Sequence, residues 1–208
     1  MIHGVTPIAP GELRTNDNPM QSTTWALLKS ARGMQPMAFR VETSYGVLHL
    51  LILLSRTTSG KYTAYCPWGP EISIPEDLHG LFLEKLSERI KPMLPSNTVV
   101  IRYDLPWESP YETPREEPSV QSMELRMNIG TEQWRLRKAS TDIQPPHSVV
   151  IHTARDPEAL LESMKSKTRY NIRLAYRHGV EVKVGGEEKL GSFHRLYEKT
   201  MERKGLRV

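Results

Sequence analysis

The chain has 208 residues, of which 38% are hydrophobic and 25% are charged, with 28 Lys and Arg against 24 Asp and Glu. This composition fits one large or two small globular domains and excludes a wholly disordered chain. The longest apolar run, residues 47–54, is much shorter than the roughly 20 residues that cross a bilayer. The N-terminus lacks the pattern of a secretion signal, and the single cysteine, Cys66, cannot form an internal disulfide. We therefore expect a cytoplasmic protein.

The first predicted elements are a short helix and an antiparallel meander. Residues 21–31 are amphipathic, with Ser22 as a candidate N-cap. Strand-like patterns follow at 37–43, 45–54 and 61–67, and a Thr-Thr-Ser-Gly turn separates the last two.

A long helix and a strand come next. Apolar residues repeat at helical spacing over 75–93, and Ser73 followed by Glu76 has the spacing of a capping box. Residues 98–103 are β-branched and apolar, which predicts a buried strand that ends before Asp104.

The segment 106–119 separates the predicted helices and strands into two groups. Proline recurs at every fourth position from Pro106 to Pro118, with glutamates between. Because proline removes backbone donors and holds the chain extended, we expect an exposed loop. A docking motif for a partner is the alternative interpretation.

The second half has its own signals. Asp156 and Pro157 have the cap and first-turn pattern of a helix start, and Gly179 is a candidate helix C-cap. These signals delimit strands at 148–151 and 180–184 and helices from 156, at 167–178 and at 187–204.

This order predicts a mixed α/β fold with two parts. Residues 1–145 would form the first domain, and 146–208 the start of a second. Two strands make a poor sheet alone, so we expect the second part to be incomplete or to borrow strands from elsewhere.

A basic segment is the strongest functional signal. Residues 164–179 carry five Lys or Arg and no carboxylate. In a helix, positions four apart share a face, so a stripe of like charge would form that repels itself and favours an anionic ligand such as phosphate. Tyr170 or Tyr176 could stack on a base, while a solvated face balanced by distant carboxylates is the alternative interpretation. The stripe comprises Lys165, Arg169, Arg173 and Arg177.

Asp104 and Lys29 are the other candidate site residues. A carboxylate at a strand end could act as a general base toward an amine, with Arg102 and Tyr103 beside it as substrate contacts. A turn-forming role for Asp104 and a dipole-compensating role for Lys29 are the structural alternatives. The histidines show no metal-ligand spacing, and Cys66 is typical of a small buried residue, so we expect neither a metal nor a cofactor.

Several segments together resemble the FemA/FemB/FemX family of peptidoglycan-bridge aminoacyltransferases. They are QSTTWALLK, VVIRYDLPW, DIQPPHSVVI, MKSKTRYNIRLAYRHGVEV and FHRLYEKTMERKG, and they occur in this order from Gln21 to the C-terminus. The MKSKTRYNIRLA stretch, followed by GVEV, is the most specific of them.

This resemblance implies two acetyltransferase-like (GNAT-like) domains and aminoacyl-tRNA as donor. The acceptor would be the stem-peptide amine of a UDP- or lipid-linked muropeptide precursor, and a lipid-linked acceptor would bring the protein into peripheral contact with a membrane. Family members are longer, so the resemblance implies a chain that ends within the second domain. It assigns Lys29 to the nucleotide or pyrophosphate of the acceptor and Asp104 to the acceptor cleft. The resemblance also implies that a basic helix of the family corresponds to the segment with Lys167, Arg169, Asn171 and Arg173.

Two other functions remain open from the sequence. One is a CoA-dependent GNAT-class N-acyltransferase, although residues 126–130 lack the spacing of the usual pyrophosphate loop. The other is a non-catalytic module that binds RNA or an anionic lipid head group.

Overall fold

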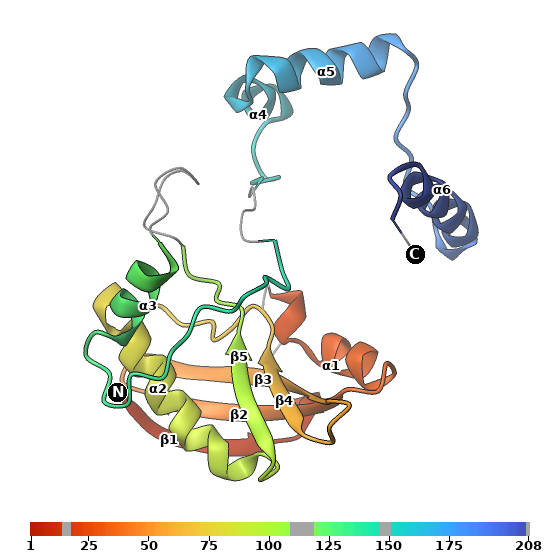
Figure 1. Cartoon of the computed structure of the whole chain (residues 1–208). Coiled ribbons are helices and arrows are strands. Elements are labelled where there is room, and N and C mark those ends of the chain that lie inside the picture. Colours follow the sequence, from red (N-terminus) through yellow and green to blue (C-terminus); the bar gives the residue numbers. More distant parts are fainter. Residues whose placement is uncertain (14–17, 109–118, 146–150, 207–208) are drawn as a thin grey trace. The chain divides into compact units, whose positions relative to one another are not determined.

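The computed structural model describes residues 1–13, 18–108, 119–145 and 151–206. The chain divides into two units, Met1–His147 and Ser148–Val208, and each is described by itself (Figure 1). Most of the predicted proline-rich loop (109–118) and most of the predicted strand at 148–151 lie outside the described residues.

The first unit is built on a five-stranded mixed sheet with the order β1-β2-β3-β4-β5. The first four strands are antiparallel neighbours, whereas β4 and β5 run parallel. The predicted meander is confirmed as β2, β3 and β4, but β1 was not predicted. The strands are β1 (Ile2–Ile8), β2 (Gln35–Thr43), β3 (Gly46–Arg56), β4 (Tyr62–Cys66) and β5 (Thr98–Tyr103).

Helices cover both faces of this sheet. Successive side chains of a strand point to opposite faces, so Leu50 and Ile52 of β3 pack with Phe82 of α2 (His79–Ile90). Leu51 of β3 packs instead with Ala26 of α1 (Thr23–Ser30). The apolar run at 47–54 is therefore a central strand buried on both sides, and the unit has the α/β fold of a GNAT-like domain.

The helix predicted over 75–93 is confirmed, but its ends differ from the prediction. A 3-10 turn (Glu76–Leu78) precedes α2, and another (Lys91–Met93) follows it. The predicted capping box is wrong, because the residue before α2 is Leu78 and its side chain accepts no capping hydrogen bond. Pro75 disfavours helical geometry in the residue before it, which leaves Ser73 outside the helix.

Strand β5 lies at an edge of the sheet and is not the buried strand that we predicted. The exposed fractions of Val99 and Val100 are 56% and 49%. Composition predicts the strand but cannot tell an edge from a centre. After β5, α3 (Val120–Asn128) packs so closely on α2 that a Cβ added at Gly80 would lie 1.7 Å from the Met127 carbonyl oxygen.

The regular elements of the described second unit are all helical, and they are α4 (Pro157–Ser163), α5 (Ser166–Arg177), a 3-10 turn (Glu187–Lys189) and α6 (Leu190–Arg203). The predicted helix start is confirmed, because Asp156 Oδ2 accepts hydrogen bonds from two backbone N–H groups at 3.0 Å. Gly179 ends α5 with φ +70°, as predicted.

The strand predicted at 180–184 is wrong, since this segment is irregular. Val182 and Val184 are 95% and 104% exposed, so their alternating pattern has no sheet to pack against. Among residues 151–206, none is buried. The described part of the second unit therefore has no hydrophobic core of its own.

Candidate functional site

The carboxyl ends of β4 and β5 meet at Asp104, the residue after β5. Its backbone N–H donates to the Cys66 carbonyl oxygen at 3.0 Å, and its own carbonyl oxygen accepts from Gly69 N–H at 2.8 Å. These bonds fix the backbone of Asp104 between the two strand ends. Ligands of open α/β sheets bind outside the carboxyl ends of parallel strands, so this is the first candidate site.

The Asp104 carboxylate is held by two neighbours on the same side of the sheet. Tyr65 Oη donates to Oδ2 at 2.5 Å, and Arg102 Nε lies 3.8 Å from Oδ1. Burial raises the pKa of Tyr65 above its ordinary value, and the hydrogen bond to Asp104 adds to this. The structure thus brings together Asp104, Arg102 and Tyr65, of which only the first two were predicted.

Arg102 also ties the last part of the unit to these strand ends. Its Nη2 donates to the carbonyl oxygen of Thr141, while its buried Nε has no hydrogen-bond partner within the described chain. The Gln144 side chain hydrogen-bonds Tyr65. Residues 141–144 therefore lie against the site.

Tyr103, predicted beside Asp104, points to the opposite face of the sheet. It packs against the core under α2, and its hydroxyl lies 3.0 Å from Ser87 Oγ. Burial raises the pKa of this hydroxyl. This placement separates Tyr103 from Arg102 and Asp104, as the alternation of a strand requires.

Gln21, the first residue of the QSTTW segment, joins β3 to the end of β4. Its side chain accepts from Leu51 N–H at 2.7 Å and donates to the Pro67 carbonyl oxygen at 2.5 Å. A Cβ added at Gly69 would lie 2.9 Å from this amide. Because Gln21 is 2% exposed, its role is to satisfy buried backbone groups where β4 leaves β3.

Lys29 lies at the end of α1, with its Nζ 4.6 Å from the centre of the Trp25 ring. Ser22 caps this helix as predicted, since its hydroxyl accepts from Trp25 N–H at 3.2 Å. Trp25 and Tyr65 pack against the same buried cluster. The lysine is therefore positioned by a cation–π contact on the face of the sheet that carries Asp104.

The predicted basic stripe lies on α5, with Lys165 as its N-cap residue. The other predicted contacts, Lys167 and Asn171, are exposed on the same helix. None of the five cations forms an ion pair with a carboxylate in the part of the chain that the structure describes. Four of these cations are exposed, and Arg169 is half-buried.

Arg169 differs from the other cations of α5. Its Nη1 donates to the carbonyl oxygens of Glu162, at 3.0 Å, and Met164. These carbonyls lie at the C-terminal end of α4, where a cation is favourable. Arg169 thus joins α4 to α5 and is less available to a ligand than Arg173.

Residues 13–208 match the sequence model of the FemAB family. The chain belongs to the FemAB family. This confirms the resemblance seen in the sequence and makes the protein a member of a transferase family. No curated protein and no solved structure matches the chain. Among the described residues, no helix combines the length and apolarity needed to cross a bilayer.

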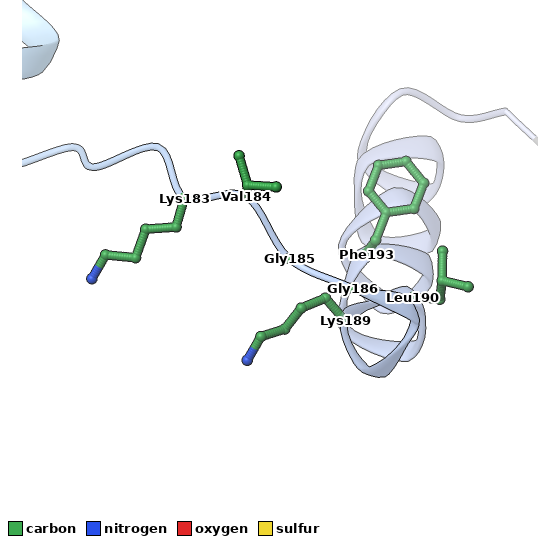
Figure 2. Close-up of a pocket in the computed structure, with 7 residues that line it drawn as sticks. All are labelled: Lys183, Val184, Gly185, Gly186, Lys189, Leu190 and Phe193. Carbon is green, nitrogen blue, oxygen red and sulfur yellow. The ribbon is translucent and has the colours of Figure 1, made fainter.

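A shallow hollow of about 390 Å³ lies at the start of α6 in this FemAB chain. Lys183 and Lys189 extend away from Leu190 and Phe193, so the two charges do not converge on the apolar side (Figure 2). Lys183 pairs with Glu181 at 2.8 Å, and Glu188 accepts from Gly186 N–H at 3.2 Å. Local partners therefore occupy Lys183 and the Gly186 N–H group, two of the groups that an anion would need.

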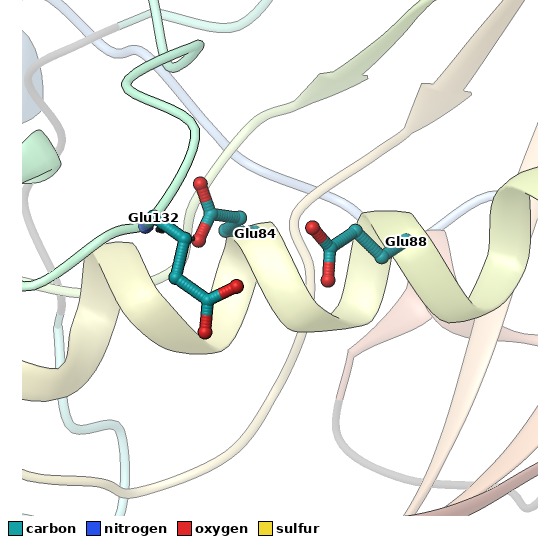
Figure 3. A group of neighbouring side chains, drawn as sticks. All are labelled: Glu84, Glu88 and Glu132. Atoms are coloured by element: carbon teal, nitrogen blue, oxygen red, sulfur yellow. Dashed lines mark hydrogen bonds between the residues drawn. The ribbon is translucent and has the colours of Figure 1, made fainter.

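Three glutamates of the FemAB chain gather near α2, with ligand oxygens within 4.8 Å of one another (Figure 3). The buried Glu84 accepts from the N–H groups of Glu132 and Gln133, each at 2.7 Å. Lys85 Nζ lies 2.8 Å from Glu132 and 3.4 Å from Glu88. These bonds give the cluster a structural role in holding the loop after α3.

Proposed function

We propose that this FemAB protein is an aminoacyltransferase that moves an amino acid from aminoacyl-tRNA to the stem-peptide amine of a peptidoglycan precursor. The family match over residues 13–208 supports this activity. The observation that carries the proposal is α5, whose exposed cations have no carboxylate partner in the described chain, because both substrates are polyanions. We also propose that 1–145 and 146–208 belong to two GNAT-like domains.

The reaction needs alignment and proton transfer but no covalent enzyme intermediate. The acceptor amine attacks the ester carbonyl of the charged tRNA, so that a C–N bond forms and the ester C–O bond breaks. The ribose hydroxyl leaves with a proton, and the amine loses one. The ester is already activated, so holding the two reactants together supplies much of the rate enhancement.

In this scheme Asp104 accepts the amine proton, and Tyr65 orients its carboxylate through the hydrogen bond at 2.5 Å. Lys29 and Arg102 hold the pyrophosphate of the acceptor. Arg173 and its neighbours on α5 bind phosphates of a nucleotide-bearing substrate. Charged tRNA is a cytoplasmic donor, so a cytoplasmic location belongs to the proposal, with peripheral membrane contact for a lipid-linked acceptor.

The test is transfer of a radiolabelled amino acid from charged tRNA to a UDP-linked or lipid-linked muropeptide by the 208-residue chain. We expect Asp104→Asn to lower kcat by about 100-fold or more, since general base catalysis contributes at least that much. The Asn side chain retains an acceptor for Tyr65, so the fold should persist. Arg173→Ala should raise the KM for the nucleotide-bearing substrate.

The matched control is Lys199→Ala, which removes an exposed cation from α6 and should leave transfer unchanged. Absence of transfer with every aminoacyl-tRNA and both acceptors would contradict the proposal. Micromolar binding of acetyl-CoA in that case would favour the CoA-dependent alternative. Steeply salt-dependent RNA binding without any transfer would favour the binding module.

A further inference from the structure

One face of α5 combines aromatic and cationic side chains. At 100° per residue, positions 170, 173 and 177 of a helix lie within about 60° of one another. Tyr170 is 56% exposed, and the Arg177 guanidinium carbon lies 5.9 Å from the centre of its ring. Tyr176 is 74% exposed, but its position on the helix is about 120° away from that of Tyr170.

We infer that Tyr170, Arg173 and Arg177 form a site for an unpaired nucleotide, with the base stacked on Tyr170 and its phosphate on Arg173. This inference rests on the proposed function and specifies which part of the substrate α5 recognises. The ligand has to be unpaired, because the bases of a duplex are already stacked on each other and cannot lie against a side chain.

The contact between Tyr170 and Arg177 explains why an exposed tyrosine would favour a base. Arg177 restrains the ring through a cation–π contact, which reduces the ordering that a ligand must impose. The exposed part of the Tyr170 ring, which Arg177 does not cover, remains available for stacking with a flat base. Arg173 follows Tyr170 by three residues, so it lies on the adjacent turn, and its fork of N–H donors matches a phosphate.

The experiment is a set of binding titrations of the 208-residue chain with three probes. Uridine diphosphate and a four-nucleotide single-stranded RNA carry bases, whereas inorganic pyrophosphate carries the charge alone. We expect Tyr170→Leu to weaken binding of both nucleotide probes about tenfold, within the range measured for single base stacks. Binding of pyrophosphate by Tyr170→Leu should stay unchanged, and Arg173→Ala should weaken all three probes.

Tyr176→Leu is the matched control, since it removes a more exposed tyrosine from the same helix and should leave all three affinities unchanged. Helix content by circular dichroism establishes that the variants are folded. Tighter binding of uridine diphosphate would identify the nucleotide-linked acceptor as the source of the base, and tighter binding of RNA would identify the tRNA end. Both results support the site.

The inference is overturned when no probe binds the wild type, when Tyr170→Leu affects pyrophosphate as strongly as the nucleotides, or when Tyr176→Leu gives the same loss as Tyr170→Leu. Transfer activity is scored separately. Transfer without dependence on Tyr170 would overturn the nucleotide site alone, and base-dependent binding without transfer would overturn the proposed reaction alone.

Discussion

The two units of the chain differ in how they place apolar and charged side chains: the first unit buries or pairs many of them, and the second exposes most of them. In the first unit, strand β3 is apolar on both faces, and the site carboxylate Asp104 is 14% exposed with bonded neighbours. In the described second unit no residue is buried, and the cations of α5 other than the half-buried Arg169 are exposed. Substitutions of buried residues in the first unit should therefore act mainly on stability, and those of exposed residues on α5 mainly on ligand binding.

The sharpest test of this contrast compares two phenylalanines on helices. Phe82 of α2 is 0% exposed and Phe193 of α6 is 67% exposed. We expect Phe82→Ala to lower the free energy of unfolding by about 3–5 kcal/mol, because it leaves a cavity in the core. Phe193→Ala should change it by less than about 0.5 kcal/mol. Urea unfolding measures both, and equal losses would show that the second unit has a core of its own.

A second comparison uses two glutamines of the first unit. Gln21→Leu leaves Leu51 N–H and the Pro67 carbonyl without their partner. A buried group left unbonded costs about 1–3 kcal/mol, so we expect a loss of about 2–3 kcal/mol in unfolding free energy. Gln35→Leu, at an exposed position of β2, is the control and should be nearly neutral. A neutral Gln21→Leu would show that water satisfies these groups.

Much of the first unit could be predicted from local patterns. The apolar run at 47–54, the turn after it and the helical spacing over 75–93 each indicate one element, and all are present. The strand β1 was missed because IHGVTPI contains glycine and proline and no clear alternation. The prediction of a strand at 180–184 was wrong although its residues alternate clearly, because a strand also needs a neighbouring strand to pair with.

The candidate site was only partly predictable. Asp104 and Arg102 stand out because they follow a strong strand, but Tyr65 comes from β4 and reaches Asp104 only through the parallel pairing of the two strands. No local pattern in the sequence predicts the pairing of β4 with β5. The QSTTW segment contains Gln21, yet the contact of Gln21 with β3 depends on tertiary structure. Spacing placed the cations on α5, but it could not show that Arg169 bonds to α4.

A smaller effect concerns the pH dependence of the first unit. His79 stacks on Trp107 with ring centres 3.8 Å apart, and burial lowers the pKa of His79 from its ordinary value of 6.5. The folded state therefore favours neutral His79, and the unfolded state binds more protons as the pH falls below 6.5. Unfolding free energy should thus decrease over that range, and His79→Gln should reduce this decrease.

Titration of the histidine resonances by NMR checks the cause directly. The pKa of His79 should lie below 6.5, and Trp107→Leu, which removes the stack, should move it back toward this value. His79→Gln identifies the resonance. A pKa at or above 6.5 in the wild type would contradict the burial of this ring.

The smallest expected effect is on the salt dependence of RNA binding, which should differ between variants of Arg173 and Arg169 on α5. Each phosphate contact with a single strand contributes about 0.7 to the slope of log K against log salt. Arg173→Ala should therefore reduce the slope by about 0.7. Arg169→Ala should reduce the slope less, because its guanidinium already donates to the carbonyls of Glu162 and Met164. The control Lys199→Ala should leave the slope unchanged.

Equal reductions for Arg169→Ala and Arg173→Ala would mean that Arg169 releases the carbonyls of α4 and binds RNA. In that case Arg169 would not serve to link α4 to α5, as we infer from its hydrogen bonds.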